Sequence, residues 1–277
     1  LSVFETGRIR SQVRSARASC DTTVALFLSR RRETVESVLS KLGVKAWILR
    51  GPHVAFDSRD AVLVVTVGGD GTLLAASHHV DKVPLLGVNS APELSIGFFC
   101  AARLSIVNKL LVQALEGKLP RVELARMQVK MDGRVVSRHV LNEALFCHAI
   151  PAATSRYILR FGRRSEEQRS SGLWIGTAAG STGALRSAGG SILPLQSQQL
   201  QLVVREPYQG ETKPYRMEKL LVPEGQAISV QNKMNDGRLF LDGPFKQLNV
   251  RLASLLHFSV SEEPLTVLGV RAKRYRG

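Results

Sequence analysis

A short apolar segment that runs directly into a glycine cluster is the feature that most constrains the fold of this chain. Residues 61–67 are almost uninterruptedly apolar and rich in Val, and residues 66–74 read TVGGDGTLL. A strand of this kind is typical of a parallel sheet that is covered on both faces. In the turn that follows, glycines surround Asp70, so the chain can either reverse tightly or bring its backbone close to a bound group.

The first hundred residues alternate between helix and strand patterns, as an α/β layer does. Strands are predicted at 46–49, 61–67 and 84–88, and helices at 32–42 and 72–80, with Thr72 as the N-cap of the second helix. The strand, glycine turn, helix and following strand make a βαβ unit. We therefore expect an α/β domain over residues 1–103.

After a predicted helix at 104–116, the pattern changes to short β-branched or alternating segments. They are separated by turn signals such as Asp132-Gly133 and Asp242-Gly243. An all-β domain is expected over residues 104–262. Residues 263–277, which include PLTVLGV, either add a strand to it or return to the first domain.

The formal charge of +15 predicts attraction to anions. Only 6% of residues are aromatic and none is interleaved with the basic runs, so no nucleic-acid partner is predicted.

No apolar stretch approaches the ~18 residues of a membrane span, which predicts a soluble cytoplasmic protein without a membrane partner. The Arg- and Ser-rich opening, residues 1–20, also fits organellar targeting. Cys20, Cys100 and Cys147 lie too far apart for a zinc knuckle or a disulfide framework.

Three segments could carry chemistry. GGDGT is either a simple strand-to-helix turn or a phosphate cradle; it lacks the third glycine of a dinucleotide fingerprint and the lysine of a Walker loop. Residues 177–183 form either a loose loop or a surface of small residues on which a ligand lies against main chain. Ser181 as a hydrolase nucleophile is disfavoured, because GSTG is not GxSxG. Asn142 and Glu143 interrupt an apolar run and must find buried partners or line a pocket.

In their order along the chain these motifs resemble those of the ATP-NAD kinase family. The resemblance extends from about residue 60 to 195 and rests on GGDGT, GVN at 87–89, LNE at 141–143, GTAAGST at 176–182 and SAGG at 187–190. SRY, RSSGL and VVREP are most similar to the plant-type NADH kinases of that family. The resemblance implies a two-domain fold with the active site between an α/β domain and a β-rich, dinucleotide-binding domain.

The implied reaction moves the γ-phosphoryl group of ATP to the 2′-hydroxyl of the adenosine ribose of NAD or NADH. A divalent cation, Mg²⁺ by expectation, would be held mainly by the phosphates of ATP, because the sequence offers no dedicated oxygen cage. By resemblance, Asp70 is the catalytic carboxylate, and the chain forms a homo-oligomer, a dimer or a tetramer. The implied nucleotide-binding residues are Gly68, Gly69, Gly71, Thr72, Asn89, Asn142, Glu143, Arg156, Arg169, Thr177, Gly180, Ser181, Thr182, Ala184 and Ser187.

Two alternatives remain open. GGDGT also occurs in diacylglycerol and sphingosine kinases, so a lipid or small-molecule kinase is one, and a non-catalytic nucleotide-binding protein is the other. Ala184 stands where many relatives have an aromatic residue, and we expect a stacking contact to be missing there. The choice between NAD and NADH is not predicted.

Overall fold

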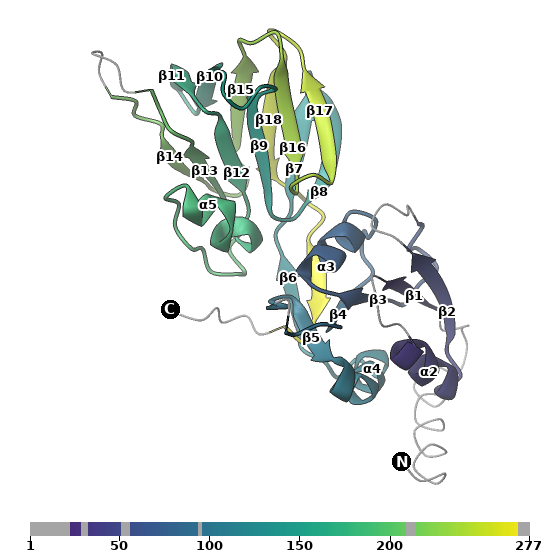
Figure 1. Ribbon diagram of the computed structural model, residues 1–277. Helices are drawn as coiled ribbons and strands as arrows, with labels where there is room; N and C mark the ends of the chain where they lie inside the picture. The colour runs from purple at the N-terminus through teal and green to yellow at the C-terminus, as the bar shows by residue number, and fades with distance from the viewer. Residues whose placement is uncertain (1–22, 29–32, 51–55, 94–95, 209–213, 271–277) are drawn as a thin grey trace. The chain divides into compact units, whose positions relative to one another are not determined.

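The computed structural model describes residues 23–28, 33–50, 56–93, 96–208 and 214–270, which form two compact units (Figure 1). The expected targeting segment, Cys20 and the basic runs at 30–32 and 271–276 lie outside these ranges. One unit ends at Glu123 and takes in the segment from Leu265; the other runs from Leu124 to Pro264. The division differs from the expected one at residue 103, because Val107 and Leu111 are buried in the core of the first unit.

The first unit is built on a seven-stranded sheet in which β1, β2, β3 and β4 run parallel. Its order is β2-β1-β3-β4-β19-β6, and β5 also pairs with β4. The strands are β1 (Thr23–Leu28), β2 (Lys45–Arg50), β3 (Leu63–Gly68), β4 (Leu85–Asn89), β5 (Cys100–Arg103), β6 (Arg121–Leu124) and β19 (Leu265–Leu268). Every residue of β3 and β4 is buried, as the apolar runs predict. Strand β1 was not predicted.

Helices cover both faces of this sheet. α2 (Glu33–Lys41) and α4 (Val107–Leu115), the latter preceded by η1 (Leu104–Ile106), lie on one face, and α3 (Asp70–Ser77) lies on the other (Figure 1). The predicted N-cap of α3 is wrong: the cap is Gly69, and the N–H of Thr72 donates to the carbonyl of Gly69 within the first turn. In the part of the chain that the structure describes, none of the helices has the length and apolar character that a membrane span requires.

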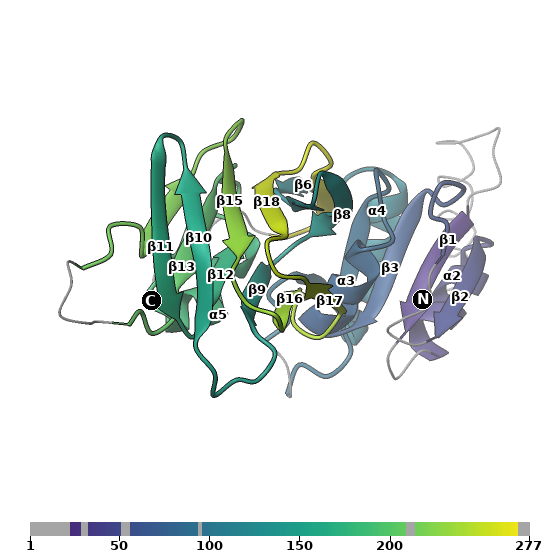
Figure 2. The same ribbon diagram turned by 90° about the horizontal axis from the view of Figure 1, so that it is seen from above.

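The second unit consists of two six-stranded sheets, which confirms the all-β prediction. Their orders are β11-β10-β15-β18-β7-β8 and β14-β13-β12-β9-β16-β17 (Figure 2). The strands are β7 (Met127–Met131), β8 (Arg134–Val140), β9 (Glu143–His148), β10 (Ser155–Phe161), β11 (Arg164–Ser170), β12 (Leu173–Gly176), β13 (Leu200–Val204), β14 (Lys219–Val222), β15 (Ala227–Asn232), β16 (Gly237–Leu241), β17 (Lys246–Val250) and β18 (Leu255–Val260). Two short helices, η2 (Ala179–Thr182) and α5 (Ala184–Ser187), follow β12.

Both sheets contribute to one apolar core. Phe146 on β9 and Tyr157 on β10 come from different sheets, and their rings meet edge to face at 5.9 Å. The hairpin turns at Asp132-Gly133 and Asp242-Gly243 have φ angles of 52°, 80°, 50° and 65°. Two successive positive φ values match the right-handed twist of paired strands.

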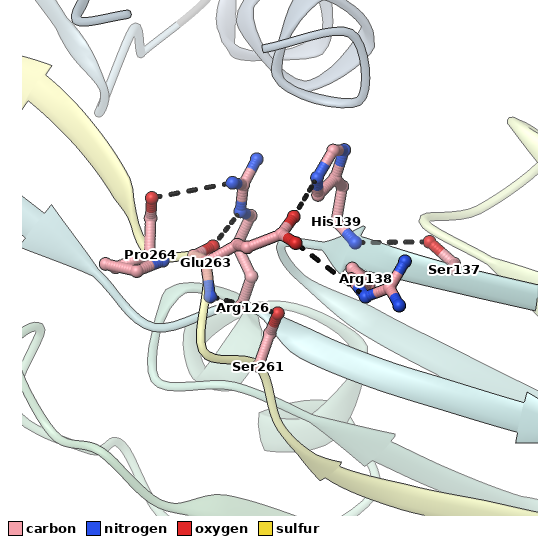
Figure 3. A network of polar contacts seen from close by, with 7 residues as sticks. All are labelled: Arg126, Ser137, Arg138, His139, Ser261, Glu263 and Pro264. Carbon is pink, nitrogen blue, oxygen red and sulfur yellow. Dashed lines mark hydrogen bonds and ion pairs between the residues drawn. The ribbon is translucent and has the colours of Figure 1, made fainter. Parts of the chain in front are cut away.

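A buried arginine binds the two segments at which the chain enters and leaves the second unit (Figure 3). Arg126 is fully buried, and its guanidinium group donates to the carbonyl oxygens of Glu263 and Pro264. The Glu263 carboxylate lies 2.7 Å from Nε2 of His139 and 3.7 Å from Nε of Arg138. Since a buried guanidinium needs several acceptors, Arg126 holds these segments in register.

Candidate active site

The glycine turn lies where two adjacent parallel strands end. Gly68, the last residue of β3, pairs with Asn89, the last residue of β4, and Asp70 opens α3 directly after the turn. Ligands of open α/β sheets bind outside the carboxyl ends of such strands. Gly71 is exposed, and a β-carbon built on it would meet no atom within 4 Å, so packing does not require a glycine there.

The Asp70 carboxylate is held in one orientation by two backbone amides. The N–H of Phe98 donates to Oδ2 at 2.8 Å, and the N–H of Phe99 donates to Oδ1 at 2.8 Å. Each carboxylate oxygen has two acceptor positions, so one remains on each oxygen for a ligand. Sequence reasoning missed these two amides, because contacts of backbone groups leave no residue-type signal.

Asn89 shapes the segment that carries those amides. Its side chain is 4% exposed, and Oδ1 accepts the N–H of Ala91 at 3.1 Å. Gly97 has φ +62°, and a β-carbon on it would lie 2.3 Å from Nδ2 of Asn89. In the structure Asn89 thus acts on the turn before Phe98, and its expected contact with a nucleotide stays a prediction.

In the second unit, the LNE segment and the small-residue segment after β12 form one structure. The N–H of Thr177 donates to the carbonyl of Asn142 at 2.9 Å, and the Thr177 hydroxyl donates to the carbonyl of Leu141. A β-carbon on Gly176 or Gly180 would lie 2.5 or 2.4 Å from the Asn142 carbonyl oxygen. These glycines are therefore required by close packing of main chain on main chain.

Asn142 and Glu143 bring polar groups to this structure. The Oδ1 atom of Asn142 is buried, and no hydrogen-bond partner is found for it among the described residues. Such atoms are rare in protein interiors, so the amide is a candidate to bind a ligand. Burial, and after it the charge of Asp242, raises the pKa of Glu143 to about 7. The stability that comes from its protonated form is present below the ordinary value of 4.5 and is lost as the pH rises through 7.

The hydroxyl groups of Thr177 and Ser181 form hydrogen bonds within the protein. Both side chains are fully buried. The Thr177 hydroxyl accepts the N–H of Ala179 at 3.0 Å, and the Ser181 hydroxyl donates to the carbonyl of Ala178 at 2.9 Å and accepts the N–H of Leu193 at 3.0 Å. Their expected role as direct contacts with the nucleotide stays a prediction, and the burial and bonding of Ser181 argue further against a nucleophile. Thr182 and Ser187 are exposed.

A pocket of about 450 Å³ lies beside α5. It is lined by two predicted residues, Ala184 and Ser187, and by Trp174, Ala188, Val204, Arg205 and Glu206. The guanidinium carbon of Arg205 lies 5.8 Å from the centre of the Trp174 ring. Sequence reasoning did not single out Trp174 or Arg205 as site residues. Position 184 has no aromatic ring, but Trp174 on β12 supplies one to this pocket.

Arg156 and Arg169 lie directly opposite each other on β10 and β11, and both are exposed. They belong to a different sheet from Glu143. Two like charges at opposed positions destabilise a sheet, which an anion between them would relieve. Their contact with a nucleotide stays a prediction.

Known proteins are similar to this chain over most of its length. Residues 16–119 match the ATP-NAD kinase N-terminal domain. A probable NADH kinase of Oryza sativa subsp. japonica is 34% identical over 259 residues, which cover 84% of this chain and 79% of the relative. The NADH kinase of Arabidopsis thaliana is 34% identical over 255 residues, covering 84% of this chain and 80% of the relative.

Solved structures show the same fold. An NAD kinase from Archaeoglobus fulgidus in complex with ATP superposes with a TM-score of 0.72 at 20% identity, covering 90% of this chain and 94% of the other. Yeast NADH kinase complexed with NADH gives 0.76 at 15% identity, covering 91% and 84%. The fold is therefore that of the two-domain NAD kinases. From its similarity to the plant enzymes, the chain belongs to the ATP-NAD kinase family.

Proposed function

We propose that this chain transfers the γ-phosphoryl group of ATP to the 2′-hydroxyl of the adenosine ribose of NAD or NADH, which gives NADP or NADPH. The observation that carries the proposal is the carboxylate of Asp70, oriented by two amides at the start of a helix in a chain of this family. The presence of the LNE and GTAAGST segments argues against a lipid kinase. So does the similarity of this chain to NADH kinases.

Asp70 has a defined part in this reaction. The 2′-oxygen forms a bond to the γ-phosphorus, the bond from that phosphorus to the β–γ bridging oxygen breaks, and ADP leaves. The hydroxyl proton passes to the Asp70 carboxylate, which is free to accept it once the hydroxyl becomes acidic during transfer. Because phosphoryl transfer depends mainly on positioning, the two amides that fix the carboxylate contribute to catalysis.

The start of α3 suits a phosphate group. N–H groups of a first helical turn point outward and carry partial positive charge. The exposed Gly71 leaves this backbone uncovered. A divalent cation fits a site with one carboxylate, because Mg²⁺ binds through few protein ligands and substrate phosphates. The phosphates of ATP would mainly hold it, and the ion would neutralise their charge.

The dinucleotide would be bound by the second unit. The Asn142 amide and the Glu143 carboxyl group can bond ribose hydroxyls, and the pocket with Trp174 and Arg205 offers an aromatic face to one of the base halves. The proposal requires that one dinucleotide reaches both Asp70 and these residues. A homo-oligomer, dimer or tetramer, is part of the proposal, and light scattering of the purified chain measures it.

A coupled assay tests the function. The purified chain is incubated with ATP and Mg²⁺ and either NAD or NADH, and NADP(H) is measured with a dehydrogenase specific for it. We expect product from at least one of the two substrates, and their relative rates give the preference. Diacylglycerol and sphingosine serve as competing acceptors in a parallel assay with labelled ATP. Labelled lipid without NADP(H) would contradict the proposal.

Gly71→Ala should weaken the binding of the ATP phosphates without lowering the stability of the fold. Alanine favours a helix over glycine by about 1 kcal/mol, and no neighbour stands in its way, so we expect the thermal stability to stay equal or rise. If the phosphates of ATP lie against this backbone, the added methyl should raise the KM for ATP about tenfold, which corresponds to about 1.4 kcal/mol. Ser40→Ala, at an exposed position of α2, is the control and should change neither quantity. An unchanged KM in Gly71→Ala would argue against close approach at this glycine.

A further inference from the structure

The carboxylate of Asp242 accepts hydrogen bonds from three successive backbone amides. Oδ2 accepts the N–H of Leu141 at 2.8 Å, and Oδ1 accepts the N–H groups of Asn142 at 2.7 Å and Glu143 at 3.2 Å. Asp242 is 3% exposed and lies in the turn between β16 and β17. Its own N–H donates to the carbonyl of Glu143 at 2.9 Å. A buried carboxylate with this many donors is well compensated for its loss of water.

The backbone N–H groups of Leu141 and Asn142 need a side-chain acceptor because of their position between two strands. β8 ends at Val140 and β9 begins at Glu143, so Leu141 and Asn142 fall between two strands and outside the regular ladder. Buried backbone N–H groups need an acceptor, and a carboxylate facing a row of them is a strong one. Asp242 thus replaces the missing strand partner for this segment.

The carbonyl side of the same segment is bound as well. The carbonyl groups of Leu141 and Asn142 accept from the hydroxyl and the N–H of Thr177. With both sides of its peptide groups bonded, the segment has one backbone conformation. The directions in which the Asn142 and Glu143 side chains leave the backbone are then set by Asp242 and Thr177.

We propose that Asp242 is a positioning residue for dinucleotide binding. It acts through the backbone of residues 141–143 and aims the Asn142 amide and the Glu143 carboxyl group at the ribose hydroxyls. Because it is buried, it makes no contact with the substrate itself. The role rests on the proposed function, and it is distinct from the role of Asp70, which concerns the transferred phosphoryl group.

Asp242 also acts on Glu143 through its charge. The strand neighbour of Glu143 on β12 is Gly176, which has no ionisable group, and Asp242 follows β16 on the other side. After burial, the Asp242 charge is the cause that raises the pKa of Glu143 to about 7. Loss of this charge should lower that pKa, so a variant at position 242 should shift the pH dependence of dinucleotide binding towards acid.

Asp242→Asn is the decisive variant, and Asp132→Asn is its matched control. Asparagine keeps the shape and tolerates the φ of +50°, but it removes the charge and turns an NH₂ group towards one of the amides. Asp132 also lies in an Asp-Gly hairpin turn, with φ +52°. Its carboxylate likewise caps a backbone amide, that of Leu255 at 2.8 Å, but it has no contact with residues 141–143.

We expect Asp242→Asn to raise the KM for the dinucleotide on the order of ten- to a hundredfold, the factor for losing one charge-assisted hydrogen bond. The KM for ATP should stay the same, and the pH at which the dinucleotide KM changes should move below that of the natural chain. Asp132→Asn should behave like the natural chain in all three quantities. A folded Asp242→Asn with natural dinucleotide KM and pH profile overturns the proposal.

Amide hydrogen exchange in the natural chain tests the contact without any variant. The N–H groups of Leu141 and Asn142 should exchange as slowly as those of neighbouring strands, although they lie outside the ladder. Fast exchange at both overturns the role of Asp242, whatever the activity of the chain. Slow exchange in a chain that makes no NADP(H) supports the backbone contact and contradicts the proposed function instead.

Discussion

Asp70→Asn should lower the rate of NADP(H) formation by about two to four orders of magnitude, the range typical of losing a positioned proton acceptor. The amide cannot take up the proton of the 2′-hydroxyl. It also turns an NH₂ group towards the N–H of Phe98 or Phe99, where each carboxylate oxygen now accepts one bond at 2.8 Å. The loss should fall on kcat, because the residue acts on the reacting hydroxyl rather than on the bulk of either substrate.

The measurement is steady-state kinetics of the purified variant, together with thermal unfolding. One lost hydrogen bond should cost about 1 kcal/mol of folding free energy, which is too small to unfold the chain and to mimic the kinetic effect. Asp57→Asn is the control, since Asp57 is an exposed carboxylate of the same unit that pairs with Arg59. If Asp70→Asn turns over at the natural rate, Asp70 is not the proton acceptor.

Gly180→Ala should have the second large effect, through the packing of two backbone segments. An added β-carbon would lie 2.4 Å from the carbonyl oxygen of Asn142 and 2.6 Å from its carbonyl carbon. Because these are backbone atoms, one segment must move, at a cost of about 1–3 kcal/mol for forced overpacking. Movement of Asn142 displaces the polar groups that would bind the dinucleotide, so we expect its KM to rise at least about tenfold.

Ser165→Ala is the control in the same unit. Ser165 is exposed on β11 and lies outside the segment of residues 176–183. We expect the control to keep the natural unfolding temperature and to leave the dinucleotide KM close to natural. Equal behaviour of the two variants would show that the contact with Asn142 does not matter for binding.

Local patterns predicted much of the fold. The apolar run at 61–67 became the fully buried β3, and both Asp-Gly turns have the positive φ values that hairpins need. Each of these depends on side chains near in sequence. The N-cap at Thr72 was wrong because the helix begins earlier: Gly69 is the cap, with an extended backbone conformation, and Asp70 is already helical. Strand β1 was missed, although it pairs with both β2 and β3.

The residue types of the candidate site could be read from the motifs, but their roles could not. Thr177 and Ser181 were expected to contact a ligand; in the structure the Thr177 hydroxyl donates to the carbonyl of Leu141, and the Ser181 hydroxyl donates to that of Ala178. Trp174 and Arg205 were not singled out as site residues, and both line a pocket. A motif reports which residues occur together, whereas the direction of a side chain depends on packing that distant segments provide.

By itself the sequence determined the periodicity of its strands and helices, the places where glycine or an Asp-Gly turn is needed, and the resemblance to the ATP-NAD kinases. Those properties are local, because they follow from φ/ψ preferences and from the alternation of apolar side chains. Only the tertiary structure decided which group bonds which: Asp242 meets Leu141 across 101 positions, and Asp70 meets Phe98 across 28. Every residue except proline offers the same backbone N–H, so the partner of that N–H depends on the fold and not on the neighbouring residue types.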